Sequence, residues 1–62
     1  MKVRDMIRRL VDDGWVKVSQ RGSHRQFKHP TKLGKVTVPG KPSDDLATGT
    51  YRNILRQAGL QE

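Results

Sequence analysis

Apolar residues in the first part of the chain recur at the spacing of a single helical face. On a helix with a period of about 3.6 residues, one stripe would carry Met6, Ile7, Leu10 and Val11. Gly14 then supplies a stop of the left-handed type, which commonly ends helices. The pattern predicts a helix over Val3–Asp13, although no Ser, Thr, Asp or Asn stands before Arg4 to cap its start.

The next segment alternates between apolar and polar side chains, which is typical of strands. In Trp15–Gln20 the alternation puts Val16 and Val18 on one face, so we expect a half-buried strand with both valines turned inward. A turn follows at residues 21–23. It leads into a second extended run, in which Phe27 is the expected core anchor.

A third strand and a long connector follow. Residues 31–34 have the composition of a short hairpin connection, and Lys35–Val38 alternates again before Pro39 ends it. Residues 39–49 hold two prolines, two glycines and an Asp pair, which indicates a loop. The sequence therefore predicts three antiparallel strands in succession, followed by a connector.

The C-terminal part predicts a second amphipathic helix. Thr50 can cap a helix over Tyr51–Ala58, and Gly59 is its expected stop. The order is then α-β-β-β-α in one domain over residues 1–62, of the α+β class. Two amphipathic helices and a sheet with one apolar face are most simply satisfied if both helices cover that face. The other face is left to solvent or a ligand.

Length and composition restrict the kinds of protein that the chain can be. A chain of 62 residues buries only about 60% of the surface of its unfolded form, so its stability is marginal unless a partner adds to it. Cysteine is absent, which excludes disulfides, thiolate catalysis and Cys-based zinc sites. No apolar run exceeds two consecutive residues, and a membrane span needs about 20. We therefore expect a soluble, cytoplasmic protein.

Positive charge is concentrated in the middle of the chain. Thirteen Lys and Arg against six Asp and Glu give a net charge of +7 and a pI near 10.6. Residues 21–42 contain six basic residues and no acidic one, which indicates a polyanionic partner such as nucleic acid. A basic surface that merely aids solubility is the alternative. The predicted phosphate-binding residues are Lys17, Arg21, Arg25, Lys28, Lys32, Lys35 and Lys41.

One histidine stands directly after a tight turn inside this basic segment, in Gly22-Ser23-His24. An imidazole can take or give a proton near neutral pH. RNA offers a matching reaction that needs no metal or cofactor: a base removes the ribose 2′-OH proton, and the oxygen attacks the adjacent phosphorus. We therefore take His24 as the candidate general acid or base, with Gly22 and Ser23 as its supporting turn. From residue types alone, an ordinary surface histidine is the alternative.

Other residues with possible chemistry are better explained structurally. His29 is five residues from His24, which puts the two on opposite sides of a strand, so we expect a strand-end histidine. Trp15 and Tyr51 could stack on bases, but so small a chain needs them in its core. The pair Asp44-Asp45 resembles a carboxylate site for Mg²⁺, but its loop composition favours a backbone turn, and we assign it no metal and no catalytic role.

The sequence resembles the HicA-type toxins, the small mRNA interferases of bacterial toxin–antitoxin pairs. The fragments that carry the resemblance are Gly14-Trp15, Gly22-Ser23-His24 with Phe27, Val36-Thr37-Val38-Pro39, and the run from Gly49 to Leu60. The resemblance implies a fold like that of double-stranded-RNA-binding domains, and mRNA cleavage that depends on His24. It also implies a cognate HicB-type antitoxin protein that covers this site. This chain has Gly40 and Lys41 where many relatives carry a further histidine.

Two other functions remain open from the sequence. The same basic sheet could belong to a non-catalytic RNA-binding module, for which the wild-type chain would not cleave RNA. The basic face could instead serve only protein contacts, for which RNA binding would be weak and would depend little on salt.

Overall fold

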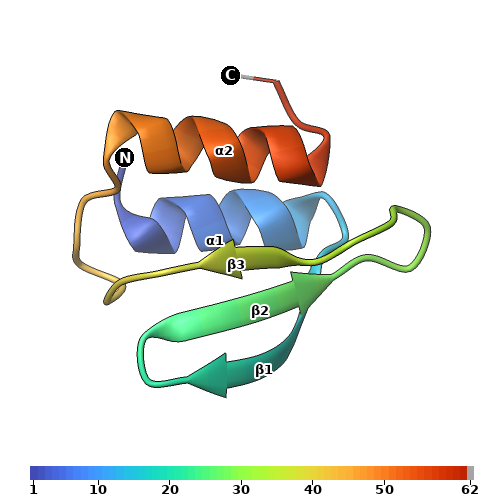
Figure 1. Cartoon of the computed structure of the whole chain (residues 1–62), viewed down its shortest axis with the longest axis horizontal. Coiled ribbons are helices and arrows are strands. Elements are labelled where there is room, and N and C mark those ends of the chain that lie inside the picture. Colours follow the sequence, from blue (N-terminus) through green and yellow to red (C-terminus); the bar gives the residue numbers. More distant parts are fainter. Residues whose placement is uncertain (62) are drawn as a thin grey trace.

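Five elements follow one another in the order α-β-β-β-α (Figure 1). The computed structural model describes residues 1–61. Its elements are α1 (Val3–Asp12), β1 (Val16–Arg21), β2 (His24–Lys28), β3 (Val36–Val38) and α2 (Thr48–Ala58). The strands form one antiparallel sheet in the order β1-β2-β3, so the predicted order and sheet are confirmed. Within these residues no helix has the length and apolarity that a membrane crossing requires.

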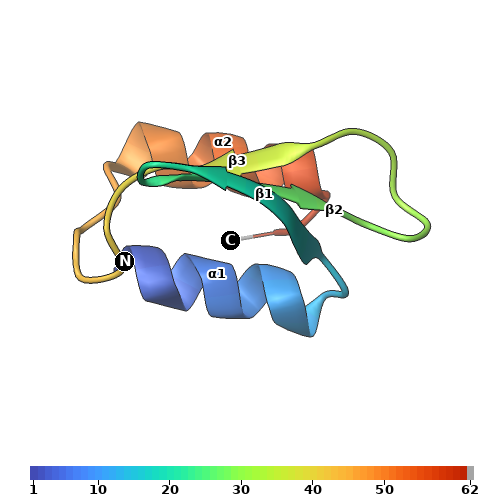
Figure 2. The same ribbon diagram turned by 90° about the horizontal axis from the view of Figure 1, so that it is seen from below.

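The two helices sit differently against the sheet. In Figure 2, α1 covers one face, whereas α2 lies alongside β3, the strand at one edge. Three strands spaced about 4.8 Å apart are about as wide as one helix, which is about 10 Å across with its side chains. The face therefore has room for one helix, and the second contributes to the same core from beside β3.

The core lies between the sheet and the two helices. Apolar residues from every element except β1 form it, together with Trp15, which follows α1. Ten are buried: Val3, Met6, Leu10, Trp15, Phe27, Val36, Val38, Ile54, Leu55 and Ala58. The expectation that Phe27 anchors the core is confirmed, and Trp15, which is 1% exposed, serves the interior. Tyr51 packs against the core from the side.

The connector over residues 39–47 provides the cap that α1 lacks. No side chain caps this helix. Instead, the backbone N–H of Val3 donates to the carbonyl of Asp44 at 2.9 Å, and that of Arg4 donates to Pro42 at 3.1 Å. The Asp44 carboxylate in turn accepts the N–H of Lys41 at 3.0 Å. These bonds satisfy free N–H groups of the first turn, and they confirm that Asp44 stabilises a backbone turn.

The start of α2 differs from the prediction. The helix begins at Thr48, its N-cap is Ala47, and Thr50 lies inside the first turn without a capping bond. The predicted cap at Thr50 is therefore wrong. The first helical bond runs from the N–H of Tyr51 to the carbonyl of Ala47 at 2.9 Å, and just before it the N–H of Leu46 donates to the carbonyl of Met1 at 2.8 Å. The predicted stop at Gly59 is confirmed, since Leu60 N–H bonds back to the Leu55 carbonyl at 2.8 Å.

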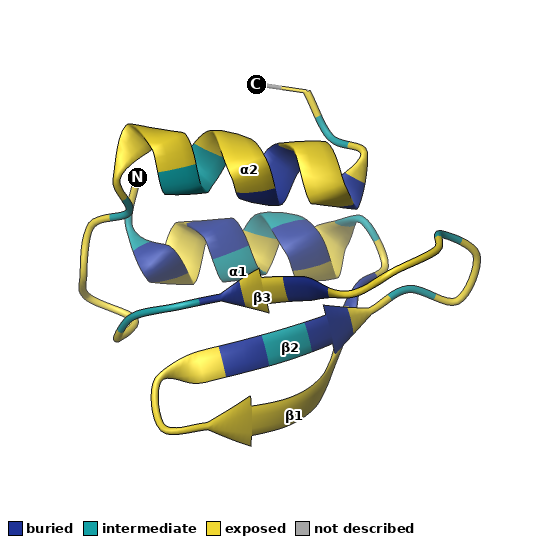
Figure 3. Ribbon diagram, viewed as in Figure 1, coloured by how far each residue is buried: buried dark blue, intermediate teal, exposed yellow. Residues whose placement is uncertain are grey.

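The prediction of a half-buried first strand is also wrong. Every residue of β1 is exposed (Figure 3), including Val16 and Val18. On the core side of the sheet, the β1 residues that oppose Phe27 and Arg25 are the polar Lys17 and Gln20. Because the pairing register shifts between Lys17 and Ser19, simple alternation does not hold along this strand. Such a shift changes which side chains face the core.

Candidate RNA-binding face

A two-residue turn places the candidate histidine at the end of the β1–β2 hairpin. Arg21 and His24 are the last paired residues, with Gly22 and Ser23 between them. Gly22 has φ +58°, whereas Ser23 does not have a positive φ. This combination is that of a type II′ turn, which needs glycine at its first central position. The turn fixes Arg21 directly across from His24, where Cβ atoms of paired residues lie about 5 Å apart.

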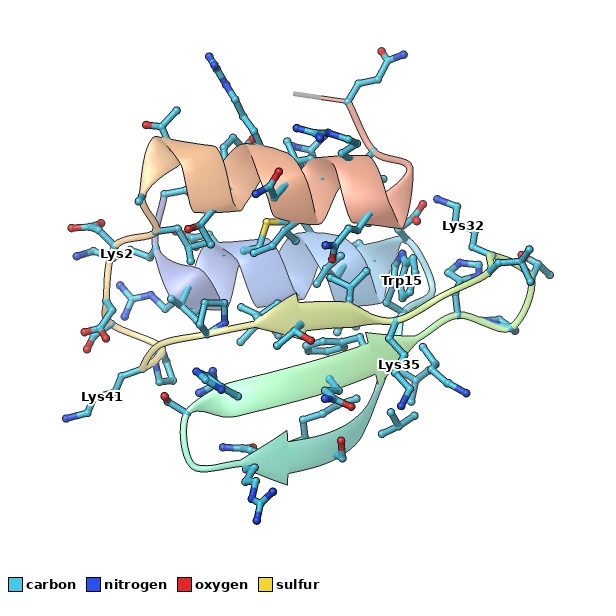
Figure 4. All side chains as sticks on the ribbon, in the orientation of Figure 1. Lys2, Trp15, Lys32, Lys35 and Lys41 are labelled. Carbon is cyan, nitrogen blue, oxygen red and sulfur yellow. The ribbon has the colours of Figure 1, made fainter. Side chains whose placement is uncertain are left out.

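His24 lies on the face of the sheet that is turned away from α1, which we call the open face. By strand pairing and alternation, this face carries Val16, Ser19, Arg21, His24, Gln26, Lys28 and Thr37. Lys35, which directly precedes β3, also points away from the helices (Figure 4). None of these residues is acidic, and His24, Arg21 and Lys28 are all exposed. The arrangement presents an accessible imidazole among positive charges, as a polyanionic substrate requires.

The open face carries three of the predicted phosphate-binding residues: Arg21 across from His24, and Lys28 and Lys35 towards the other end of β2. In Figure 4, Lys35 points away from the helices, whereas Lys32 of the same loop extends towards their ends. A strand of RNA laid along β2 would meet Arg21 beside His24 first, and Lys28 with Lys35 at the far end of the strand. Lys41 is exposed in the connector after β3, outside this face.

Arg25 is not part of the open face. Its side chain lies on the core side next to Phe27 and is only 8% exposed. The guanidinium donates to the carbonyl of Ser23 at 3.1 Å and to that of Gly40 at 2.7 Å. Arg25 therefore ties the turn that precedes His24 to the connector after β3. The predicted phosphate contact is not supported, and we assign Arg25 a positioning role.

Lys17 also lies elsewhere. It opposes Phe27 across the β1–β2 pair, on the α1 side of the sheet. Its Nζ donates to the side-chain oxygen of Gln20 at 2.9 Å. Lys17 therefore does not share a face with His24, and the structure does not bring these two predicted site residues together.

Lys32 joins the C-terminal ends of both helices. Its Nζ contacts the Asp13 carboxylate at 2.5 Å and donates to the Ala58 carbonyl at 3.0 Å. A cation is favoured at both places, because the C-terminal end of a helix carries partial negative charge. The bond from Lys32 is the largest of several effects that lower the pKa of Asp13 from its ordinary 3.8, and it outweighs the opposing effect of burial. Lys32 thus has a structural function rather than the predicted phosphate contact.

His29 is held by bonds within the protein. Its Nδ1 accepts the backbone N–H groups of Thr31 and Lys32, both at 3.1 Å. The proton is therefore on Nε2, which donates to the Asp13 carbonyl at 2.7 Å. Its ring also meets Trp15 edge to face, with 5.2 Å between ring centroids. This is the structural role expected of a strand-end histidine, and we call the set Asp13, Trp15, His29, Lys32 and Ala58 the clasp.

Sequence reasoning missed the functions of the clasp and of Arg25. A signal for Arg25 was present, since alternation already placed it on the same side as Phe27. No such signal exists for Lys32, whose partners are 19 and 26 residues away along the chain.

For metal binding, the described part of the chain holds no cluster of three or more His, Asp or Glu side chains that could bind an ion.

Comparison with known proteins identifies the family to which the chain belongs. The family model described as HicA toxin of bacterial toxin–antitoxin matches residues 3–60, nearly the full length. A comparison with curated proteins finds no match. The matched range includes all five elements, the Gly22-Ser23-His24 turn and every residue of the open face. The chain therefore belongs to the HicA toxin family of bacterial toxin–antitoxin systems.

Proposed function

We propose that this protein is a metal-independent endoribonuclease that cleaves mRNA, with His24 as general acid or base. Members of the HicA toxin family are known as ribonucleases. The observation that carries the proposal for this chain is the position of His24, exposed on the open face and paired across the hairpin with Arg21.

The chemistry follows from what these side chains can do. A neutral imidazole removes the proton of a ribose 2′-OH, and the 2′ oxygen attacks the adjacent phosphorus. The bond to the 5′ oxygen breaks and this oxygen takes a proton from water, which leaves a 2′,3′-cyclic phosphate on one fragment and a 5′-OH on the other; the imidazolium then returns its proton to solvent. Arg21 is the nearest cation by strand pairing, so it is placed to stabilise the charge that develops on the phosphoryl oxygens. Lys28 and Lys35 would hold phosphates further along the strand.

Positioning of the histidine is also supported by the structure. Gly22 and Ser23 form the turn, and Arg25 holds the Ser23 carbonyl from below. A fixed turn reduces the motion of His24 relative to bound RNA, which is the geometric requirement of acid–base catalysis. The exposed ring leaves space for single-stranded RNA to approach.

The experiment is cleavage of a defined RNA by purified protein, with and without chelator. His24→Ala should lower the cleavage rate by about 10²- to 10⁴-fold, the usual contribution of one acid–base group, without changing the urea midpoint. His29→Gln is the matched control, because His29 lies in the clasp; per folded molecule it should cleave at the wild-type rate. End mapping should find cyclic phosphate and 5′-OH termini.

Two outcomes would reject the assignment. Undiminished cleavage by His24→Ala would show that another residue is the catalyst. RNA binding without cleavage by the wild-type protein would favour the non-catalytic RNA-binding module instead. Toxin–antitoxin membership also implies a cognate antitoxin, which we propose is of the HicB type and blocks access to His24.

A further inference from the structure

An apolar groove runs between α1 and β1, on the side of the sheet opposite His24. Its volume is about 380 Å³. The lining residues are Ile7, Val11, Trp15, Val16, Lys17, Arg25 and Phe27. Neither the proposed cleavage nor the clasp uses the outer part of this groove, which is formed by Ile7 and Val11 on α1 and borders the start of β1 at Val16.

The outer wall of the groove exposes apolar surface that a small chain would otherwise need in its core. Val11, on α1, is 53% exposed, and Ile7 beside it is half-buried. Only 32% of the chain is hydrophobic, so an apolar side chain left this exposed beside an apolar groove is a notable use of it. Contiguous exposed apolar surface with a polar rim marks interaction sites.

The rim of the groove is positively charged on both sides. On α1, helical spacing makes Arg4 and Arg8 the solvent-side neighbours of Ile7 and Val11, and both are exposed. Lys17 stands on the sheet side. Neither of the two ion pairs in residues 1–61 involves these three cations. The groove therefore combines an apolar floor with two basic edges.

This combination selects among the possible occupants. A second copy of the chain would bring basic rim against basic rim and two charges of +7 together. Nucleic acid would meet the basic rim but would place charged phosphates against an apolar floor. An acidic protein segment with apolar residues along one side satisfies both parts of the groove.

The shape of β1 indicates which kind of segment fits. An extended strand could pair with the open edge of β1, but the register shift near Val18 and the flanking Lys17 and Arg21 are features that disfavour such pairing. A helix that lays its apolar stripe into the groove needs no edge pairing. We propose that the α1–β1 groove binds an acidic amphipathic helix of a partner protein.

The location of the groove gives this binding a distinct consequence. The occupant would lie on the α1 side of the sheet, whereas His24 lies on the open face. A helix bound there anchors a partner without covering the imidazole, so the rest of the partner must reach around the β1 edge to block it. The groove proposal stands on its own geometry and does not depend on whether the protein cleaves RNA.

The test is an NMR titration of the full chain with a designed helical peptide that carries Leu at i, i+4, i+7 and i+11 and Glu at most other positions. Amide shifts should change at Ile7, Val11, Val16 and Lys17 and not at His24. Val11→Glu should weaken binding about tenfold or more, as for a central interface residue. Leu33→Glu, at a 94% exposed apolar residue outside the groove, is the matched control and should bind as wild type does.

The other outcomes overturn the proposal. These are the absence of shifts at millimolar peptide, equal binding of a peptide with Lys in place of Glu, or equal loss in Val11→Glu and Leu33→Glu. Shifts in the groove caused by RNA or by increasing protein concentration alone would assign it to nucleic acid or to a second copy. His24→Ala should bind the peptide as wild type does, and saturating peptide should leave RNA cleavage unchanged. Failure of the groove proposal and failure of the catalytic proposal would therefore give different experimental results.

Discussion

Gly14, which follows α1, is the position at which a single methyl group should affect the fold most clearly. It has φ +100°, and a Cβ there would stand 2.8 Å from Nε2 of His29. That distance is too short for any real Cβ contact, so Gly14→Ala must displace the His29 ring. The ring is held between the Asp13 carbonyl and Trp15, which are parts of the clasp.

The expected loss of stability has two parts. Positive φ costs an alanine about 1–2 kcal/mol. Displacement of His29 removes its bond to Asp13, worth about 0.5–1.5 kcal/mol, and the ring contact with Trp15, worth a similar amount. The sum is about 2–5 kcal/mol. A domain of this length is stable by only about 3–9 kcal/mol, so Gly14→Ala should remove a large fraction of the total.

Gly59 provides the matched control. It follows α2 as Gly14 follows α1, and it has φ +69°. A Cβ there would meet only the Lys32 side chain, at ordinary distances of 3.7 Å from Nζ and 4.0 Å from Cε. Gly59→Ala should therefore lose only the conformational part, about 1–2 kcal/mol. At about 4–8 °C per kcal/mol for small domains, the two variants should differ clearly in melting temperature.

The assay is urea unfolding followed by fluorescence of Trp15, which is the only tryptophan and is buried. A double-mutant cycle isolates the ring contact: in a His29→Ala background, Gly14→Ala should lose only about as much as Gly59→Ala does. Equal destabilisation by Gly14→Ala and Gly59→Ala in the wild-type background would refute the reasoning. So would strict additivity of Gly14→Ala with His29→Ala.

Arg25 and Lys28 lie on opposite faces of β2, so truncation should separate their roles. Arg25→Ala should lower the free energy of unfolding by about 2–3 kcal/mol, because two carbonyls lose a charged donor, whereas Lys28→Ala should change it by less than about 0.5 kcal/mol. Conversely, in filter binding at several salt concentrations, Lys28→Ala should reduce the salt slope by about one phosphate contact; an unchanged slope would remove Lys28 from the RNA surface. For pH, the bond from Lys32 lowers the pKa of Asp13 in the folded state below 3.8. The stability it provides is complete well above that value and is lost as the pH falls through the lower, folded-state pKa. Wild type should therefore be more stable than Asp13→Asn at about pH 7, and the difference in urea midpoint should shrink towards about pH 2; a constant difference would contradict this assignment.

Much of the fold could be predicted because its signals are local. The apolar stripe of the first helix, the stop at Gly59 and the anchor at Phe27 follow from spacing within one turn of helix or one strand. The turn before His24 was equally readable, since its glycine and its place between two extended runs suffice. The family resemblance extended over the same segments, and the family match supports it.

The predictions that were wrong depended on contacts between distant segments. Thr50 is a good cap residue, but the helix begins before it, at Thr48, next to a backbone bond between the distant residues Leu46 and Met1. Val16 and Val18 alternate as an inward-facing pair would, but Val16 opposes Lys28 on the face turned away from α1, and the register with β2 shifts between Lys17 and Ser19, at Val18. Local propensity ranks what a segment favours in isolation, and small energies from tertiary contacts are enough to override it.

The sequence by itself determined the order of the elements, many of the core residues and a histidine within a basic segment, because these depend on periodicity and on neighbours along the chain. Only the tertiary structure decided which cations share a face with that histidine. A strand alternates with a period of two residues, so Arg25 lies under the sheet while Arg21 and Lys28 lie on its open face. Lys32 instead contacts partners at the C-terminal ends of the two helices. Electrostatic attraction acts between groups that are close in space, and only folding sets those distances.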